Sequence, residues 1–316
     1  MSQPTVALCI PAYNAAKFLP RLLNSAAAQV ISFDEIIVCD DASKDDTVAV
    51  ARSFGAEVIV NSANSGCSVS KNNALNAAST DWIHFHDADD ELLPNFTSLA
   101  RHWAIRPDAP DVILFDYEYR DNDTGELIAR SDFSDEKLRQ DQLRYAILNQ
   151  INPFCGLYRR ARLLEVNGYD TEPEILYNED VAFHCKLALA GFIFRAEKEV
   201  SIINYRINGS MSGANQVKCL KAHHAVMRKV AAAVGHKYPA EIASRLWAAA
   251  TGLAAYQEWE SADAALGDAQ KLYRGVPRNQ PKRFAALCRV VGPRVAFRLR
   301  ERAIRLFKPR LRRKTT

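Results

Sequence analysis

Short apolar runs alternate with helical stretches over the first 115 residues, and this alternation constrains the fold more than any other feature. Strand-like runs occupy residues 5–10, 35–39, 57–60, 82–85 and 112–115. Helical periodicity lies between them, at residues 17–29, 44–54, 68–78 and 94–105. Strands separated by single helices form parallel β-α-β units with helices on both faces of a sheet. We therefore expect an α/β fold with an open, mainly parallel sheet.

The pattern changes along the rest of the chain. It loosens at residues 116–150, where the turn 123–125 indicates a hairpin, and then gives a helix at 180–190 and strands at 192–196 and 201–205. Beyond Gly213 the sequence becomes Ala-rich and helical. We therefore expect an α/β domain at 1–213, a helical region at 214–281 forming a small packed bundle, and a basic tail at 282–316.

Charge is divided unevenly between these regions. The formal net charge is +4, but residues 282–316 hold 13 basic residues and one acidic residue, a net of +12. The preceding residues hold 28 basic and 36 acidic residues, a net of −8. The near-neutral total therefore joins an acidic body to a basic tail with a separate role.

Residues 294–307 of the tail are predicted to form an amphipathic helix. A helical wheel places Arg294, Arg298, Arg302 and Arg305 on one side and an apolar arc on the other: Ala296, Leu299, Ala303, Leu306 and Phe307. Such a segment can bind an anionic membrane surface, or it can pack on the protein with a solvated basic face. Nucleic-acid binding is disfavoured because the aromatic residues do not interleave with the basic ones.

Composition places the chain among globular proteins, because 48% of its residues are hydrophobic and 25% are charged. Its seven cysteines are scattered without a C-x-x-C pair, which argues against a disulfide framework or structural zinc site. No apolar run is long enough to cross a membrane, and the first 13 residues do not resemble a signal peptide. We expect a cytoplasmic protein, with peripheral attachment to the inner membrane face through the tail as an extension of that expectation.

Polar loops follow the first four predicted strands. They span residues 11–14, 40–47, 61–70 and 86–90. In parallel α/β sheets ligands bind just beyond the carboxyl ends of the strands, so these loops are the candidate site. Three of them carry acids or amides able to hold a nucleoside or a metal.

The acidic cluster after the fourth strand is the sharpest of these features. Asp87 and Asp89 stand at i and i+2 and can give oxygen ligands to Mn²⁺ or Mg²⁺, with diphosphate oxygens and water completing the shell. The alternative is a helix cap or a solvated acidic turn. In the second loop we assign Ser43 and Asp46 to helix capping and leave a neighbouring acid to contact a base or ribose.

Several other chemistries lack their motifs. No G-x-G-x-x-G follows the first strand, and neither a P-loop nor a G-x-S-x-G nucleophile elbow occurs. For His84, His86 and His184 we expect hydrogen-bonded imidazoles rather than metal ligands.

The order of these motifs resembles family 2 glycosyltransferases, which are inverting enzymes of the GT-A fold that use nucleotide-diphospho sugars. The resemblance covers roughly residues 4 to 100, through Pro-Ala-Tyr-Asn at 11–14, Asp-Asp-Ala-Ser at 40–43, Asn-Ser-Gly at 64–66 and Asp-Ala-Asp-Asp at 87–90. It continues more weakly through residues 156–160, 168–170, 178–180, 205–206 and 210–212.

The resemblance implies a role for each matching position. Pro11, Tyr13 and Asn14 would line the nucleotide pocket and Asp41 would contact the base, with Lys71 as a basic residue near the nucleotide. Asp87 and Asp89 would form the metal motif, with Asp89 as the direct ligand. Asp180 would be the catalytic base, and Arg206 would lie over the diphosphate.

Inverting transfer needs one carboxylate to take the proton of the acceptor hydroxyl as it attacks the anomeric carbon. Without the family resemblance, the sequence favours Asp180 as an ordinary acid at a helix N-terminus, a position that would lower its pKa. We predict transfer from a nucleotide-diphospho-sugar, with UDP as the expected nucleotide, to a glycan or lipid-linked acceptor in cell-surface polysaccharide or glycolipid synthesis. The alternatives are a sugar-nucleotidyltransferase, which would need a Gly-rich loop after the first strand, and a non-catalytic sugar-nucleotide-binding scaffold.

Overall fold

The computed structural model describes residues 3–207, 213 and 215–312. Two compact units make up the chain. The sheet unit comprises Met1–Ala146, Gln150–Thr171 and Phe183–Ser210, and the helical unit comprises Ile147–Asn149, Glu172–Ala182 and Met211–Thr316. The helical unit thus includes a segment from the middle of the chain, residues 172–182, together with the C-terminal helices.

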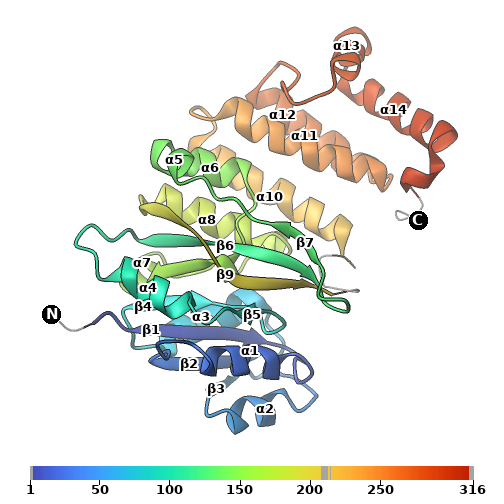
Figure 1. Ribbon diagram of the computed structural model, residues 1–316. Helices are drawn as coiled ribbons and strands as arrows, with labels where there is room; N and C mark the ends of the chain where they lie inside the picture. The colour runs from blue at the N-terminus through green and yellow to red at the C-terminus, as the bar shows by residue number, and fades with distance from the viewer. Residues whose placement is uncertain (1–2, 208–212, 214, 313–316) are drawn as a thin grey trace. The chain divides into compact units, whose positions relative to one another are not determined.

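The sheet unit contains one sheet with the strand order β3-β2-β1-β4-β8-β6-β9-β5, and β7 pairs with β6 outside that path (Figure 1). Its first four strands are β1 (Val6–Ala12), β2 (Glu35–Asp40), β3 (Glu57–Val60) and β4 (Trp82–Phe85). β1 pairs in parallel with both β2 and β4, and β2 with β3, so all four carboxyl ends face one edge. The expected open, mainly parallel α/β sheet is confirmed.

The second half of the sheet is mixed. It consists of β5 (Glu91–Leu92), β6 (Val112–Asp121), β7 (Leu127–Arg130), β8 (Gly156–Arg159) and β9 (Phe194–Arg206). β8 runs antiparallel to its neighbours β4 and β6, whereas β9 is parallel to β6. The strands expected at 192–196 and 201–205 form the single strand β9, because an irregularity in the β6 register lets pairing continue past the polar residues between them. The expected hairpin is β6–β7.

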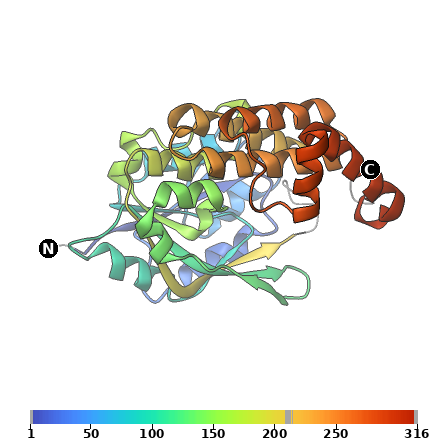
Figure 2. The same ribbon diagram turned by 90° about the horizontal axis from the view of Figure 1, so that it is seen from above.

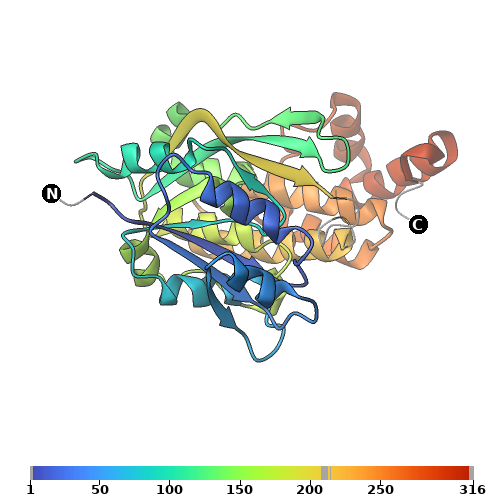
Figure 3. The same ribbon diagram turned by 60° about the horizontal axis from the view of Figure 1, so that its bottom comes forward.

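Helices cover both faces of the sheet. The helices of the first half are α1 (Leu19–Ala27), α2 (Thr47–Ser53), α3 (Cys67–Ala77) and α4 (Phe96–Ala104). Figure 3 shows α1 lying across the sheet. Alternate residues of β4 mark the two faces: His84 packs on Phe96 of α4 at 4.2 Å between ring centroids, whereas Phe85 packs on Tyr158 and Tyr169 on the other face. The remaining helices are α5 (Asp135–Gln140), α6 (Gln142–Leu148), α7 (Arg160–Glu165) and α8 (Glu179–Leu189).

The starts of α2 and α3 differ from expectation. Asp46 precedes α2 but its side chain makes no capping bond; Asp45 instead accepts from Thr47 N at 3.1 Å. Ser43 accepts from Asn14 N, so neither predicted residue caps α2. α3 begins after Gly66, whose φ of +92° suits glycine, and Ser68 lies inside the helix. Ser68, at which the sequence pattern begins this helix, therefore does not cap it, because the loop before α3 is shaped by tertiary hydrogen bonds.

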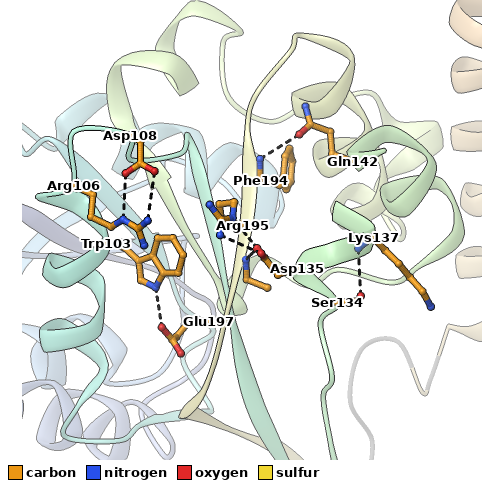
Figure 4. A network of polar contacts seen from close by, with 11 residues as sticks. Trp103, Arg106, Asp108, Ser134, Asp135, Lys137, Gln142, Phe194, Arg195 and Glu197 are labelled. Atoms are coloured by element: carbon orange, nitrogen blue, oxygen red, sulfur yellow. Dashed lines mark hydrogen bonds and ion pairs between the residues drawn. The ribbon is translucent and has the colours of Figure 1, made fainter. Parts of the chain in front are cut away.

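A polar network anchors the first half of β9 (Figure 4). Asp135 accepts from Arg195 Nε at 2.8 Å and from Ala196 N at 3.0 Å, while Trp103 Nε1 donates to Glu197 at 2.8 Å. Burial alone would raise the pKa of Asp135, but the hydrogen bonds from Arg195 and Ala196 outweigh it and lower that pKa. α4 and α5 are thus both fixed to β9.

The helical unit is built from α10 (Gln216–Val234), α11 (Pro239–Ala255), α12 (Trp259–Leu272), α13 (Lys282–Val291) and α14 (Pro293–Phe307), with 3₁₀ turns at Pro173–Ile175 and Pro309–Arg312. A further 3₁₀ turn, Pro153–Cys155, belongs to the sheet unit. α11 and α12 lie side by side (Figures 1 and 2). Trp247 of α11 is fully buried and meets Phe297 of α14 at 5.5 Å between ring centroids. Within the described residues, no helix has the length and apolar character needed to cross a bilayer.

α14 confirms the predicted helix but packs through a different face. Ala296, Phe297 and Glu301 are its buried residues. Glu301 becomes compatible with burial because Arg312 donates to both of its carboxylate oxygens. Arg298 and Arg305, expected on a solvated face, bind Asp263 and the Ala255 carbonyl. Most of the predicted apolar arc is left exposed: Leu299, Ala303, Leu306 and Phe307.

The Asp135 network gives a stability prediction. Asp135→Ala should lower the free energy of unfolding by about 1–2 kcal/mol, because Arg195 and Ala196 N lose a charged acceptor. Since folding lowers the pKa of Asp135, its contribution is present above the ordinary aspartate pKa and is lost as pH falls through the folded-state value. Urea unfolding of both proteins across that range measures the difference.

Asp108→Ala is the matched control, because the Arg106–Asp108 pair is solvent-exposed. It should leave the unfolding midpoint unchanged. Equal midpoints for the Asp135 variant and the wild type at neutral pH would contradict the prediction.

Candidate functional site

Pairing continues beyond the strand ends at the carboxyl edge of the sheet. Asp41 N donates to Ala12 O at 2.8 Å, Asn61 N to Asp40 O at 2.8 Å and His86 N to Cys9 O at 3.0 Å. These bonds hold the polar loops beside one another. The residues that the sequence predicts for the nucleotide and metal sites are gathered along this edge: Pro11, Tyr13, Asn14, Asp41, Asp87 and Asp89.

Asn14 joins the loop after β1 to the loop after β2. Its φ of +49° lies in the left-handed region, which asparagine tolerates better than most residues. Its N–H donates to Ser43 Oγ at 2.8 Å and its Oδ1 accepts from Lys44 N at 2.9 Å. Tyr13, just before it, is 48% exposed. The structure therefore turns an aromatic ring outward beside a rigid loop.

Asp41 is a buried acceptor that organises the loop before α3. Its Oδ1 accepts from Asn61 Nδ2 at 2.8 Å and from Ser65 N at 2.9 Å, and its Oδ2 accepts from Gly66 N at 2.8 Å. A carboxylate offers about four acceptor positions, so three are used within the protein. The fourth, on Oδ2, is available to a donor.

The loop after β4 carries three acids, Asp87, Asp89 and Asp90, whose surroundings differ. Asp90 is fully buried and accepts from Asn204 Nδ2 at 2.7 Å and Tyr205 N at 2.8 Å. Burial, with Asp87 and Asp89 nearby, holds its pKa well above the ordinary value. In the described part of the chain, no other residue donates a hydrogen bond to the carboxylate of Asp87 or Asp89.

Asp87 and Asp89 therefore form a pair of half-buried carboxylates that accept no hydrogen bond from any other described residue. Burial, followed by the charge of Asp87, raises the pKa of Asp89 to about 6. Two neighbouring carboxylates with hard oxygen atoms fit a divalent cation. Across the described residues, no cluster of three His, Cys, Asp or Glu side chains is placed to hold a metal by itself, so other ligands would have to complete the shell.

Arg21 of α1 holds the acidic loop and was not predicted from the sequence. Its guanidinium donates to the Asp89 carbonyl and, at 3.0 Å, to Asn122 Oδ1. The guanidinium carbon also lies 3.8 Å from the centroid of the Tyr205 ring. No local pattern distinguishes this arginine from a surface one, because all its partners come from distant parts of the chain.

The end of β9 is fastened to the same loop. Besides the two bonds to Asp90, Tyr205 OH donates to Glu91 at 2.7 Å. Arg206, the last residue of β9, is exposed and pairs in register with Asp121 of β6. The predicted motif at Ser210, Met211 and Ser212 lies outside the described residues.

Lys71 is buried in α3, with its Nζ 5.2 Å from the centroid of the Tyr169 ring. Tyr169 is held by Asn72, which accepts from its N–H at 2.7 Å and donates to its carbonyl at 2.9 Å. Gly168 allows this approach, since its φ is +56° and an added Cβ would lie 2.3 Å from Asn72 Oδ1. The Gly168–Tyr169 motif therefore fixes the surroundings of Lys71.

The histidines near the site are hydrogen-bonded imidazoles, as expected. His84 Nδ1 donates to Gly156 O at 2.9 Å, and its Nε2 accepts from His86 Nδ1 at 2.9 Å. Burial lowers the pKa of His84 to about 3 and that of His86 well below its usual value, so both rings are neutral. His184 shares a hydrogen bond with Tyr158 OH.

Asp180 belongs to the helical unit. It lies in the first turn of α8, whose N-terminal residues belong to that unit and whose remainder belongs to the sheet unit. Asn178, just before this helix, accepts a hydrogen bond from His223 of α10 at 2.8 Å.

Comparison with known proteins places this arrangement in a family. The family model described as "Glycosyl transferase family 2" matches residues 7–164, which is half of the chain. The chain belongs to this family. An uncharacterized glycosyltransferase of Rickettsia prowazekii is 27% identical over 184 residues, covering 57% of this chain and 58% of that protein. The first curated relatives are matched over only 25% to 58% of their own lengths.

Solved glycosyltransferase structures share the fold. S. aureus TarS 1–349, solved in complex with UDP-GlcNAc, matches with a TM-score of 0.71 and 21% identity, covering 96% of this chain and 92% of that one. The mannosyltransferase PcManGT of Pyrobaculum calidifontis, solved with GDP-Man and Mn²⁺, matches with a TM-score of 0.59 and 17% identity over 100% and 85% of the two chains. The GT-A-type fold of this glycosyltransferase is thereby established.

Arg21→Met tests how this glycosyltransferase positions its acidic loop. The change removes the donors to Asp89 O and Asn122 and the stacking on Tyr205. We expect UDP binding in the presence of Mn²⁺ to weaken roughly tenfold, equivalent to about 1.4 kcal/mol. Isothermal titration measures the change, with the exposed Arg52→Met as control. If the Arg21 variant bound UDP with wild-type affinity, the contacts of Arg21 would not be needed to position the loop.

Proposed function

We propose that this glycosyltransferase moves a sugar, with inversion, from a UDP-sugar to a hydroxyl of a glycan or lipid-linked acceptor. The observation that carries the proposal is the pair Asp87 and Asp89, two carboxylates without hydrogen-bond donors at the carboxyl edge of a family 2 sheet. TarS, which has the same fold, was solved with UDP-GlcNAc, so UDP-GlcNAc is the first donor to test.

On the donor side, Tyr13 provides an exposed ring for the base and Asp41 retains one acceptor position for a base N–H. Pro11 and Asn14 shape the loop around them, and Lys71 adds buried positive charge behind the loop before α3. Arg206 is exposed at the end of β9 and would contact the diphosphate. These side chains bind and orient the donor.

The proposed cofactor is Mn²⁺ or Mg²⁺, held by Asp89 with Asp87 beside it. When bound, the cation would neutralise charge on the departing nucleoside diphosphate. The two carboxylates suit that role because each lacks a donor, and their mutual repulsion is relieved by a positive charge. The fold relative PcManGT was solved with Mn²⁺.

On the acceptor side we propose Asp180 as the general base. Inverting transfer proceeds by in-line displacement, so a single carboxylate must remove the acceptor proton and no covalent enzyme intermediate forms. Asp180 lies in the first turn of α8, where N–H groups and the helix dipole favour its ionised form. A role in cell-surface polysaccharide or glycolipid synthesis follows from the proposed acceptor class.

Asp89→Asn tests the proposed cation site. The amide keeps the size of the side chain but removes the charge, so Mn²⁺-dependent UDP-GlcNAc turnover should fall at least about 100-fold while the melting temperature stays near that of the wild type. Asp46→Asn, at an exposed residue whose side chain makes no capping bond, is the control and should keep full turnover. Wild-type turnover by the Asp89 variant would overturn the metal assignment.

A donor screen separates the enzyme from a non-catalytic scaffold. Thermal shifts with UDP-, GDP- and dTDP-sugars plus Mn²⁺ should identify the donor, because a bound ligand raises the melting temperature. A shift accompanied by release of the nucleotide supports the transferase. Binding of no sugar nucleotide would sink the proposal.

We also propose that α13 and α14 bring the enzyme to an anionic membrane surface. After α14 has buried its packing face, apolar side chains remain exposed, including Leu306 at 75% and Phe307 at 82%. The same C-terminal stretch carries exposed cations: Arg289, Arg302, Lys308 and Arg310. Apolar residues flanked by cations are typical of helices that lie in the headgroup region of a bilayer.

The double variant Leu306→Ser/Phe307→Ser tests membrane binding without disturbing Phe297. We expect less co-sedimentation with phosphatidylglycerol vesicles, because two exposed apolar anchors are lost, and unchanged turnover of UDP-GlcNAc. Ile105→Ser, at an apolar residue of the sheet unit that is 60% exposed, is the control. Equal vesicle binding by the double variant and the wild type would refute the proposal.

A further inference from the structure

α10 contacts the chain segment that leads into α8, at three points within the helical unit. The contacts are Lys218 Nζ with Tyr177 OH at 3.3 Å, His223 Nδ1 with Asn178 Oδ1 at 2.8 Å, and Lys229 Nζ with Glu172 Oε1 at 2.8 Å. The two lysine contacts are exposed to solvent and so contribute little to stability. His223 is only 8% exposed, so its hydrogen bond to the segment is a buried one.

The hydrogen bond defines the state of His223. An amide oxygen only accepts, so Nδ1 of His223 carries the proton and donates it to Asn178. Burial, followed by the charges of Arg245 and His224, lowers the pKa of His223 to about 3, so the ring is neutral. Its Nε2 is then a bare acceptor, buried and without a hydrogen-bond partner among the described residues. Burying an unsatisfied nitrogen costs stability, which a residue retained only for packing would avoid.

Asn178 connects His223 to the start of α8. Its N–H donates to Ile175 O at 2.8 Å, and its carbonyl accepts from Ala182 N at 3.3 Å, forming the first turn of the helix. Asp180 lies in that turn. Fixing the side chain and backbone of Asn178 therefore fixes the direction in which the Asp180 side chain leaves the helix.

We propose that His223 is a positioning residue for the catalytic base: through Asn178 it holds the first turn of α8 so that Asp180 keeps the orientation needed to remove the acceptor proton. The inference rests on the proposed role of Asp180. The rate of base catalysis depends steeply on geometry, and a displacement of about 1 Å costs on the order of 100-fold. The C-terminal helices thereby contribute to catalysis.

The chain offers matched variants. His223→Leu removes the donor while filling a similar volume, and His223→Asn places an amide N–H near the position of Nδ1 and should restore the bond. His224→Leu is the control, because His224 is the neighbouring histidine on α10 and bonds Asp268 of α12 at 2.9 Å, away from α8. It removes a tertiary histidine bond of the same unit without touching Asn178.

Two readouts separate positioning from general stability. In His223→Leu, hydrogen–deuterium exchange of the peptide covering residues 173–182 should be at least about tenfold faster, and kcat for UDP-GlcNAc turnover with Mn²⁺ should fall about 10- to 100-fold with KM for the donor unchanged. His223→Asn should recover most of both effects. His224→Leu should lower the melting temperature and leave both readouts at wild-type values.

A double-mutant cycle with Asn178→Ala checks the route. If His223 acts through Asn178, the double variant should lose no more kcat than the more damaging single variant. Additive losses would overturn the route through Asn178.

The remaining outcomes are also decisive. Unchanged exchange in His223→Leu, or faster exchange with unchanged kcat, would overturn the positioning role. Asp180→Asn distinguishes this failure from failure of the proposed function: it should abolish turnover while UDP binding persists. Wild-type turnover by Asp180→Asn would overturn the base assignment itself.

Discussion

Parallel pairing of β1 with β2 on one side and with β4 on the other is the constraint on which the rest of this enzyme depends. It aligns four carboxyl ends at one edge, and the backbone bonds of Asp41, Asn61 and His86 carry that alignment into the loops. This backbone geometry brings the loops after the four strands to one edge of the sheet.

Charge at that edge is divided into satisfied and unsatisfied carboxylates. Asp41 and Asp90 are buried and accept hydrogen bonds from backbone N–H groups, so they stabilise the conformation of the loops. Asp87 and Asp89 stand beside them and accept no hydrogen bond from another described residue, and burial, followed by the charge of Asp87, raises the pKa of Asp89. Arg21 holds the loop through the Asp89 carbonyl and stacks on Tyr205, and its charge offsets only part of the effect of burial on Asp89.

The helical unit contains more than the C-terminal helices. Residues 172–182 are grouped with α10–α14, and α10 contacts them through two exposed lysines and one buried histidine. α14 buries Phe297 against Trp247 and neutralises Glu301 with Arg312, while its remaining apolar residues face outward. One region therefore combines a firmly packed interior with an exposed amphipathic face.

The sequence by itself determined the first four strands, the sheet edge, and the acidic and amide residues that meet there, because these depend on local periodicity and on the short connections of β-α-β units. It did not predict the single strand β9, the start of α3 after Gly66, the packing face of α14 or the tertiary hydrogen bonds of Arg21 and His223. Each of these features depends on partners distant in the chain. β9 depends on the irregular pairing with β6, the start of α3 on the bond from Gly66 N to Asp41, and the packing face of α14 on the contact of Phe297 with Trp247. Arg21 donates to Asp89 O, and His223 bonds Asn178. Local patterns determine which residues can form a strand or a helix and which side chains can bind a metal. Only tertiary contacts determine which partner each side chain meets.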